Sequence, residues 1–361
     1  MPQTERIDAA LDAFKRGELV IVTDDETREN EGDLIIAASL CTPEKMAFII
    51  RHTSGIVCAP LTAEEAKRLH LDPMVAVNDA PLGTAFTVSI DARHGLTTGI
   101  SAEERCNTVR ALANNNIGAA DFVRPGHVFP LIARQGGVLM RSGHTEAAVN
   151  LCALAGLPAV AAIGELMNED GAVMRGPDLA TFAEKHGLTI ITVADLIAYR
   201  QAQEKLVERV GELTIQTPIG TAQGIVYKTP FDEAEQLALV FGDVNGGAVP
   251  VRFHRQNILQ DIFGDQARLN ASYARFQIEG RGVLVYLRDG AAGVPVSHLA
   301  PKAPDHANAS AQKTSWREVG LGAQILRDLG VNSIRLISAR PRRYVGLEGF
   351  GITIAATDLL E

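Results

Sequence analysis

The sequence has few cysteines, few basic residues and no long apolar run, and each scarcity argues against a class of protein. Its four cysteines include no CxxC pair, so neither a disulfide framework nor a structural zinc site is expected. No apolar run is long enough for a transmembrane helix, and the N-terminus lacks an apolar secretory core. We therefore expect no membrane partner and a cytoplasmic location.

Basic residues are too few for a nonspecific nucleic-acid binder. The net charge of the 361-residue chain is −9, and residues 1–205 hold 18 lysines and arginines against 27 aspartates and glutamates. Residues 206–361 hold 16 residues of each sign. This balance argues against nucleic acid as a partner. Because the chain is longer than one ordinary core, we expect two domains, residues 1–205 and 206–361.

The most acidic stretch runs from Asp24 to Asp33 and reads DDETRENEGD. It lies between two apolar runs, which the pattern predicts as paired strands with the acidic stretch at their tip. In an extended backbone, Glu29, Glu31 and Asp33 share one face. Such oxygen ligands suit Mg²⁺ or Mn²⁺, and Arg28 would hold an anionic substrate beside the ion. A solvated acidic hairpin tip explains the stretch equally well.

Two later segments place a histidine where the backbone is constrained. The segment 124–130, RPGHVFP, predicts a rigid loop that positions His127 for proton transfer, with a surface histidine as the alternative. The segment 141–151, RSGHTEAAVNL, predicts a helix whose N-terminus favours an anion beside Arg141. His144 in that turn is a candidate metal ligand, although an ordinary capped helix with an exposed histidine fits the same residues.

Local signals predict further elements. Pro43 after Thr42 predicts the start of a helix, and Ser101 with Glu104 forms a capping-box pattern. A buried strand is predicted to end near Glu165, which is therefore either a candidate general base or a strand-end residue that faces water. Beyond residue 212 the pattern changes to strands and turns, so the expected fold class is α+β.

Four segments in order resemble the 3,4-dihydroxy-2-butanone 4-phosphate synthases of riboflavin biosynthesis: RENEGD at 28–33, RPGHVFPL at 124–131, RSGHTEA at 141–147 and the strand with Glu165. The resemblance covers about residues 5–203 and is specific, because several long motifs agree in order and spacing. It implies a lyase that converts D-ribulose 5-phosphate into 3,4-dihydroxy-2-butanone 4-phosphate and formate. It also implies two Mg²⁺ or Mn²⁺ ions per site and a homodimer whose site receives residues from both subunits.

The same resemblance implies roles for individual residues. Glu29 and His144 match the metal ligands, and His127 and Glu165 match the two catalytic positions. The matched substrate-binding positions are Arg28, Glu29, Asp33, Arg141, Ser142, Gly143, His144, Thr145 and Glu165. Ser142 departs from some members, which have glycine there, and its backbone N–H leaves the expected contact possible.

The second half resembles GTP cyclohydrolase II more weakly, in VRFH at 251–254 and GVLVYLRDG at 282–290. Asn257, Arg268 and Asn270 stand where that family has three zinc-binding cysteines. We therefore expect no zinc and no cyclohydrolase activity. Retained activity with unusual ligands, or a domain that senses a nucleotide or phosphosugar, are the alternatives. The expected architecture is a three-layer α/β synthase domain followed by a smaller α/β cyclohydrolase-II-like domain.

Overall fold

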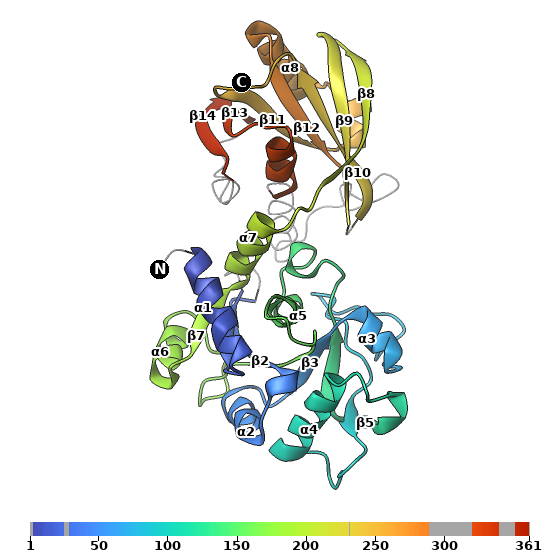
Figure 1. The fold of residues 1–361 in the computed structure, drawn as a ribbon, viewed down its shortest axis with the longest axis vertical. Helices are drawn as coiled ribbons and strands as arrows, with labels where there is room; N and C mark the ends of the chain where they lie inside the picture. The colour runs from blue at the N-terminus through green and yellow to red at the C-terminus, as the bar shows by residue number, and fades with distance from the viewer. Residues whose placement is uncertain (1–2, 25–28, 231, 289–319, 339–350, 361) are drawn as a thin grey trace. The chain divides into compact units, whose positions relative to one another are not determined.

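The chain forms two compact units, Met1–Tyr199 and Arg200–Glu361 (Figure 1). Each unit contains a seven-stranded sheet with helices, which confirms the expected two-domain α+β fold. The boundary expected after residue 205 lies shortly beyond the end of the first unit. The computed structural model describes residues 3–24, 29–230, 232–288, 320–338 and 351–360.

The sheet of the first unit is mixed, and the acidic stretch connects two of its inner strands. Its strands lie in the order β4 (Ile90–Ala92), β5 (Phe122–Ile132), β3 (Cys58–Leu61), β6 (Ala161–Glu165), β2 (Gly32–Ala37), β1 (Val20–Thr23) and β7 (Thr189–Thr192). Strands β1 and β2 pair antiparallel from Val20 opposite Ile35 to Thr23 opposite Gly32. This hairpin confirms the prediction that the acidic stretch connects two paired strands.

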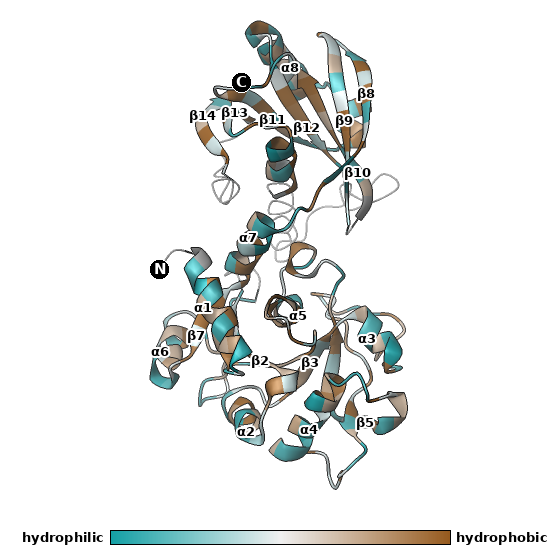
Figure 2. Ribbon diagram, viewed as in Figure 1, coloured by the Kyte–Doolittle hydropathy of each residue, from teal (hydrophilic) through white to brown (hydrophobic). Residues whose placement is uncertain are grey.

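Helices cover both faces of this sheet, which gives the expected three layers. Because neighbouring strand residues point to opposite faces, Leu34 and Ile36 enter one core while Ile35 and Ala37 enter the other. The first core is closed by α2 (Pro43–His52), α3 (Ala63–Arg68), α4 (Ala102–Leu112) and α6 (Pro177–His186). The second core is closed by α1 (Gln3–Lys15), α5 (His144–Leu154) and α7 (Val193–Gln203). Figure 2 shows apolar residues concentrated in the strands and hydrophilic residues on α1 and α3.

Two helix starts follow the predicted local chemistry. The Thr42 hydroxyl accepts a hydrogen bond from Lys45 N at the start of α2, where proline occupies the first turn. At the start of α4, Ser101 and Glu104 form the predicted reciprocal capping box. The predicted loop over 124–130 is wrong, because this segment belongs to β5. Pro125 is tolerated because it lies before the β3 pairing, which begins at Phe129, and within the irregular part of the β4 pairing.

The second unit has its own sheet and core. Its strands lie in the order β14 (Thr353–Leu359), β13 (Ser333–Ser338), β11 (Val249–Arg255), β12 (Gly282–Leu287), β10 (Asp232–Phe241), β9 (Gly220–Thr229) and β8 (Glu208–Thr217). Helix α8 (Ala267–Glu279) buries Phe276 against Phe241 and Leu284. A further helix, 320–328, places Gly322 against the Phe253 ring of β11. The short helical segments are η1 (Ala38–Leu40), η2 (Ala119–Asp121), η3 (Gly137–Leu139) and η4 (Leu259–Phe263).

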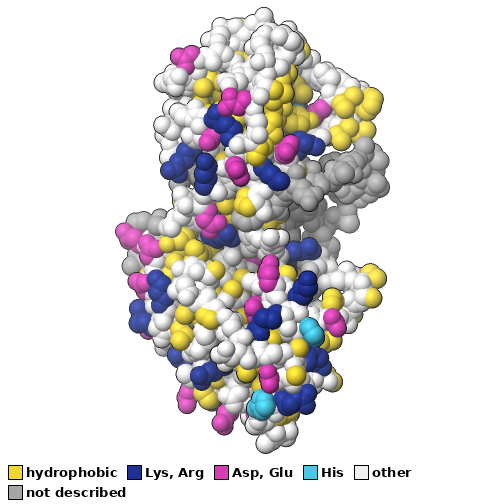
Figure 3. Space-filling view, turned by 45° about the vertical axis from the view of Figure 1, so that its right-hand side comes forward, with side chains coloured by type: hydrophobic (Ala, Val, Ile, Leu, Met, Phe, Trp, Pro, Cys, Tyr) yellow, Lys and Arg dark blue, Asp and Glu magenta, His cyan; other side chains and the backbone are white. Residues whose placement is uncertain are grey.

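The described surface carries both signs of charge. On the face drawn in Figure 3, acidic and basic side chains of the described residues alternate without a continuous basic stripe. Among the helices of the described ranges, none combines the length and apolar character that a membrane crossing requires.

Candidate active site

Asp24 fixes the turn at Glu29, which leads into β2. Its carboxylate accepts hydrogen bonds from Glu29 N at 3.0 Å and from Glu31 N at 2.9 Å. These bonds bring the Glu29 side chain back toward the end of the strand. Asn30 has a φ of 53°, so the backbone is not extended here, and simple alternation along a strand does not bring the acidic side chains together.

His144 faces this turn from the start of α5. Gly143 has an extended backbone and is the N-cap, so the His144 ring lies at the helix N-terminus, where only 6% of the residue is exposed. Its Nδ1 atom is 4.0 Å from Glu29 Oε2 and 3.7 Å from Asp33 Oδ1. The structure therefore brings together the two predicted metal ligands, Glu29 and His144.

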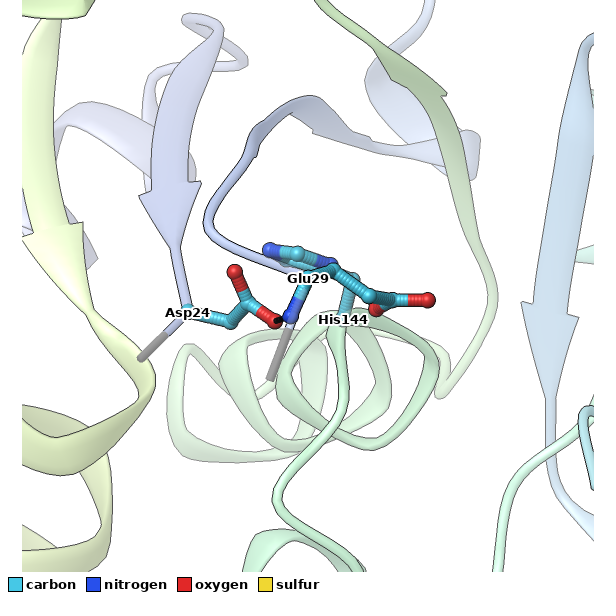
Figure 4. Close-up of side chains that lie close together, drawn as sticks. All are labelled: Asp24, Glu29 and His144. Carbon is cyan, nitrogen blue, oxygen red and sulfur yellow. Dashed lines mark hydrogen bonds and ion pairs between the residues drawn. The ribbon is translucent and has the colours of Figure 1, made fainter. Parts of the chain in front are cut away.

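Asp24 completes a group of three potential ligands, which Figure 4 shows. One ligand atom each from Asp24, Glu29 and His144 lies within 4.8 Å of the other two. Two carboxylate oxygens and an imidazole nitrogen are suitable donors for Mg²⁺ or Mn²⁺. The sequence analysis missed Asp24 as a ligand, although it stands in the acidic stretch, because it lies before the turn and not on the predicted common face.

The raised pKa values of the carboxylates around these ligands also fit a cation site. Asp33 is 2% exposed, and its Oδ1 accepts no hydrogen bond from the described residues. Burial, followed by the charges of Glu165 and Glu31, raises the pKa of Asp33 well above its usual value. Burial and the charge of Glu29 raise the pKa of Glu31 to about 7. A divalent cation would relieve both effects.

Glu165 lies beside this cluster at the end of β6. It stands opposite Asp33 of β2 in the antiparallel pair. The Ser54 hydroxyl donates a hydrogen bond of 2.7 Å to Glu165 Oε2, and Ser54 N donates to the Glu165 carbonyl oxygen. Ser54 thus fixes both the backbone and the carboxylate of Glu165. It was not predicted as a site residue, because it has no neighbouring motif.

His127 is held by a buried aspartate that the sequence analysis also missed. Asp91 of β4 accepts hydrogen bonds from His127 N at 2.9 Å and from His127 Nδ1 at 2.7 Å. Asp91 is 3% exposed. Gly99 packs so closely that a Cβ atom there would lie 2.1 Å from Asp91 Oδ2 and 2.7 Å from His127 Nδ1. Because Nδ1 donates to Asp91, the neutral ring presents Nε2 as its proton acceptor.

Strand register places His127 and Glu165 beyond the same end of β3, the strand between theirs. Phe129 of β5 lies opposite Cys58 of β3, and Cys58 lies opposite Ile163 of β6. His127 precedes Phe129 by two residues in a parallel pair, and Glu165 follows Ile163 by two residues in an antiparallel pair. Both therefore lie beyond the same end of β3, although they bond different partners, Asp91 and Ser54.

The predicted anion site at α5 contains a buried ion pair. Arg141 donates from Nη1 to Glu146 Oε2 at 2.6 Å and from Nη2 to Thr84 Oγ1 at 3.0 Å. Arg141, Gly143 and Thr145 are buried, and Ser142 is partly exposed. The Glu146 charge balances Arg141, so its contact with a substrate anion stays a prediction. Arg28 lies outside the described residues.

Comparisons with known proteins identify both units. Residues 8–199 match the family model of 3,4-dihydroxy-2-butanone 4-phosphate synthase, and residues 208–358 match the model of GTP cyclohydrolase II. The riboflavin biosynthesis protein RibBA of Salinispora arenicola is 46% identical over 365 residues, covering 97% of this chain and 87% of that protein. The protein of the same name from Bacillus cereus is 44% identical over 364 residues, covering 97% of this chain and 91% of that protein.

Solved structures agree with these matches. The two-domain 3,4-dihydroxy-2-butanone 4-phosphate synthase RibBX of A. baumannii has a TM-score of 0.82 at 38% identity, and the match covers 98% of both chains. A 3,4-dihydroxy-2-butanone 4-phosphate synthase in complex with two magnesium ions has a TM-score of 0.53 at 48% identity. That match covers 55% of this chain and 97% of the other.

The fold, the site and these relatives define an enzyme of riboflavin biosynthesis in the lyase class. The chain belongs to the 3,4-dihydroxy-2-butanone 4-phosphate synthase family, and its synthase domain is fused to a GTP cyclohydrolase II domain. The family expected from the sequence motifs is therefore confirmed.

Proposed function

We propose that the chain converts D-ribulose 5-phosphate into 3,4-dihydroxy-2-butanone 4-phosphate and formate, with Mg²⁺ or Mn²⁺ held by Asp24, Glu29 and His144. The observation that carries the proposal is that their ligand atoms lie within 4.8 Å of one another, although His144 is far from Asp24 and Glu29 in the sequence. The related structure that contains two magnesium ions supports two ions per site.

The chemistry of a bound cation suits this reaction. It would stabilise negative charge that develops on the substrate oxygens during loss of a carbon as formate. Asp33 lies beside His144 and carries an oxygen that accepts no hydrogen bond from the described residues. We assign that oxygen to a substrate hydroxyl or to a water of the ion.

His127 and Glu165 are the proposed proton-transfer groups. Asp91 orients the His127 ring and leaves Nε2 to accept a proton. Ser54 holds one carboxylate oxygen of Glu165, so the other is available as a base. The backbone N–H groups of Ser142 and Thr145 at the start of α5 are the proposed phosphate contacts, with Arg28 and Arg141 beside them. The Gly143 N–H donates to the Arg141 carbonyl oxygen at 2.9 Å.

Formate release tests this proposal. We expect purified protein with ribulose 5-phosphate and Mg²⁺ to release formate, and a chelator to stop the release. His127→Asn and Glu165→Gln should each lower kcat by about 10²-fold to 10⁴-fold. Glu169→Gln is the matched control, because Glu169 is an exposed glutamate close to Glu165 in the sequence. Turnover that persists in the chelator would refute the metal assignment, and unchanged kcat in both variants would refute the proton-transfer roles.

We propose that the second unit does not hydrolyse GTP. None of the residues at the family's cysteine positions carries a thiol, and one of them, Asn257, accepts through Oδ1 from Gln260 N at 3.2 Å. The nearby His254 donates from Nε2 to Asp261 Oδ1 at 2.8 Å, and Tyr286 donates to the other oxygen of the same carboxylate. In the ranges that the structure describes, the only group of three metal-ligating side chains is the one in the first unit.

A separate assay distinguishes this proposal from retained cyclohydrolase activity. Full-length protein with GTP and Zn²⁺ should give no diaminopyrimidine product, and robust product would refute the proposal. The triple variant Asn257→Cys, Arg268→Cys and Asn270→Cys should gain stoichiometric zinc, measured by a chromogenic chelator. Equal zinc binding by the unaltered chain would show that other ligands replace the cysteines. Binding of GTP without turnover would instead favour the sensor alternative.

A further inference from the structure

Arg105 is a buried cation that donates to the backbone next to Ser54, the residue that holds Glu165. It lies on α4 and is 6% exposed. Its Nη1 donates a hydrogen bond of 2.9 Å to the carbonyl oxygen of Gly55. Its buried Nε–H donates to no partner among the described residues. A buried guanidinium N–H without a hydrogen-bond partner destabilises the fold, which points to a role of Arg105 beyond packing.

On one side, Arg105 supports the turn that holds Glu165. Gly55 has a φ of 76°, and its carbonyl oxygen is the Arg105 acceptor. The preceding residue, Ser54, donates through its hydroxyl and its backbone N–H to Glu165. A shift of this turn would therefore move the hydrogen bonds that orient the Glu165 carboxylate.

On the other side, α4 faces the strand that carries Asp91. Thr108, one turn beyond Arg105, accepts a hydrogen bond of 2.9 Å from Ala92 N, next to Asp91. Burial lowers the pKa of Arg105, while the charge of Asp91 acts in the opposite direction. Arg105 thus supplies positive charge toward the carboxylate that holds His127.

We propose that Arg105 is a positioning residue for catalysis, which fixes the Ser54–Gly55 turn for Glu165 and balances Asp91 for His127. The inference rests on the proposed function, because His127 and Glu165 must be the proton-transfer groups. Orientation of a catalytic group by a buried neighbour affects the chemical step more than substrate binding.

Steady-state kinetics of the full-length, Mg²⁺-loaded enzyme test this inference. Arg105→Met, which keeps much of the length without the charge, should lower kcat at least about 30-fold, within the range of general acid–base catalysis. KM for ribulose 5-phosphate and the Mg²⁺ activation constant should change less than about threefold. Arg105→Lys should recover part of kcat. The control is Arg110→Met, an exposed arginine of the same helix, which should match wild type.

A double-mutant cycle separates positioning from packing. If Arg105 acts through Asp91, the combined loss in Arg105→Met with Asp91→Asn should be smaller than the product of the single losses. Strictly multiplicative losses, or a kcat of Arg105→Met within twofold of wild type, would overturn the inference. If Arg105→Met does not fold, Arg105→Lys and Ser54→Ala decide, since unchanged kcat in both overturns it. Absence of formate release by wild-type enzyme would refute the proposed function instead.

Discussion

Asp33 and Glu165 stand opposite each other on the antiparallel strands β2 and β6, with Asp33 almost completely buried. The charges of Glu165, Glu31 and Glu29 all act on Asp33 and, with burial, raise its pKa. Carboxylates gathered in this way repel one another unless a cation is present. A cation bound by this cluster, as we propose, would offset that repulsion.

The first prediction concerns stability with and without Mg²⁺. Saturating Mg²⁺ should raise the free energy of unfolding, by about 2.7 kcal/mol when its concentration is 100 times Kd. Asp33→Asn removes one repelling carboxylate, so it should unfold at an equal or higher temperature than wild type in a chelator. The gain in unfolding free energy that Mg²⁺ produces, measured by calorimetry, should be smaller in this variant than in wild type. Asp79→Asn, at an exposed aspartate, is the control, and an identical increment in Asp33→Asn would contradict the prediction.

The second prediction concerns Gly99. A Cβ atom at this residue would meet Asp91 and His127, so Gly99→Ala should separate the pair and lower kcat by about 10²-fold. Gly95→Ala is a matched control, because Gly95 has a similar positive φ of 75° and no atom within 4 Å of an added Cβ. Equal kcat for the two variants would show that backbone strain, and not displacement of His127, causes any loss.

The third prediction concerns the buried pair Arg141 and Glu146. Glu146→Gln leaves the Arg141 charge buried without its partner, so the free energy of unfolding should fall by about 3–5 kcal/mol in urea titrations. Glu146 also accepts from Arg134 N at 2.9 Å, a bond that an amide can keep through its oxygen. Glu169→Gln should change stability little, because Glu169 is exposed. If Glu146→Gln lowers the free energy of unfolding no more than Glu169→Gln does, the Arg141–Glu146 pair does not stabilise the fold.

The fourth prediction concerns acid sensitivity at His52. Burial, then the charge of His186, lowers the pKa of His52 from 6.5, and Arg51 and Lys185 add to this. The folded chain therefore binds fewer protons at His52 than the unfolded chain, so stability falls as the pH decreases below 6.5. His52→Gln should unfold with a weaker pH dependence between pH 6.5 and about 5. His70→Asn, at an exposed histidine, should keep the wild-type dependence.

Local signals predicted much of the fold. The hairpin around the acidic stretch, the Thr42 cap and the Ser101 capping box depend on neighbouring residues, and the structure contains all three. The strand over 124–130 was missed because its prolines and glycine are typical of a turn. Its pairing with β3 and β4 depends on contacts that the local sequence does not encode.

The site was predictable only where a residue stands in a recognisable motif. Glu29 and His144 stand in motifs, and the structure brings them within 4.0 Å. Asp91 and Ser54 reach His127 and Glu165 across strand pairs or turns far away in the sequence, so spacing gave no sign of them. Residues that orient catalytic groups depend on tertiary structure more than the catalytic groups themselves do.

Binding of Mn²⁺, followed by electron paramagnetic resonance, tests the central claim that Glu29 and His144 hold a divalent cation. Wild-type protein should bind Mn²⁺, and Mg²⁺ should displace it, because both ions accept the same oxygen and nitrogen donors. Glu29→Gln and His144→Asn should each weaken binding at least about tenfold, as loss of a direct ligand requires. Mn²⁺ affinity equal to wild type in both variants would contradict the account.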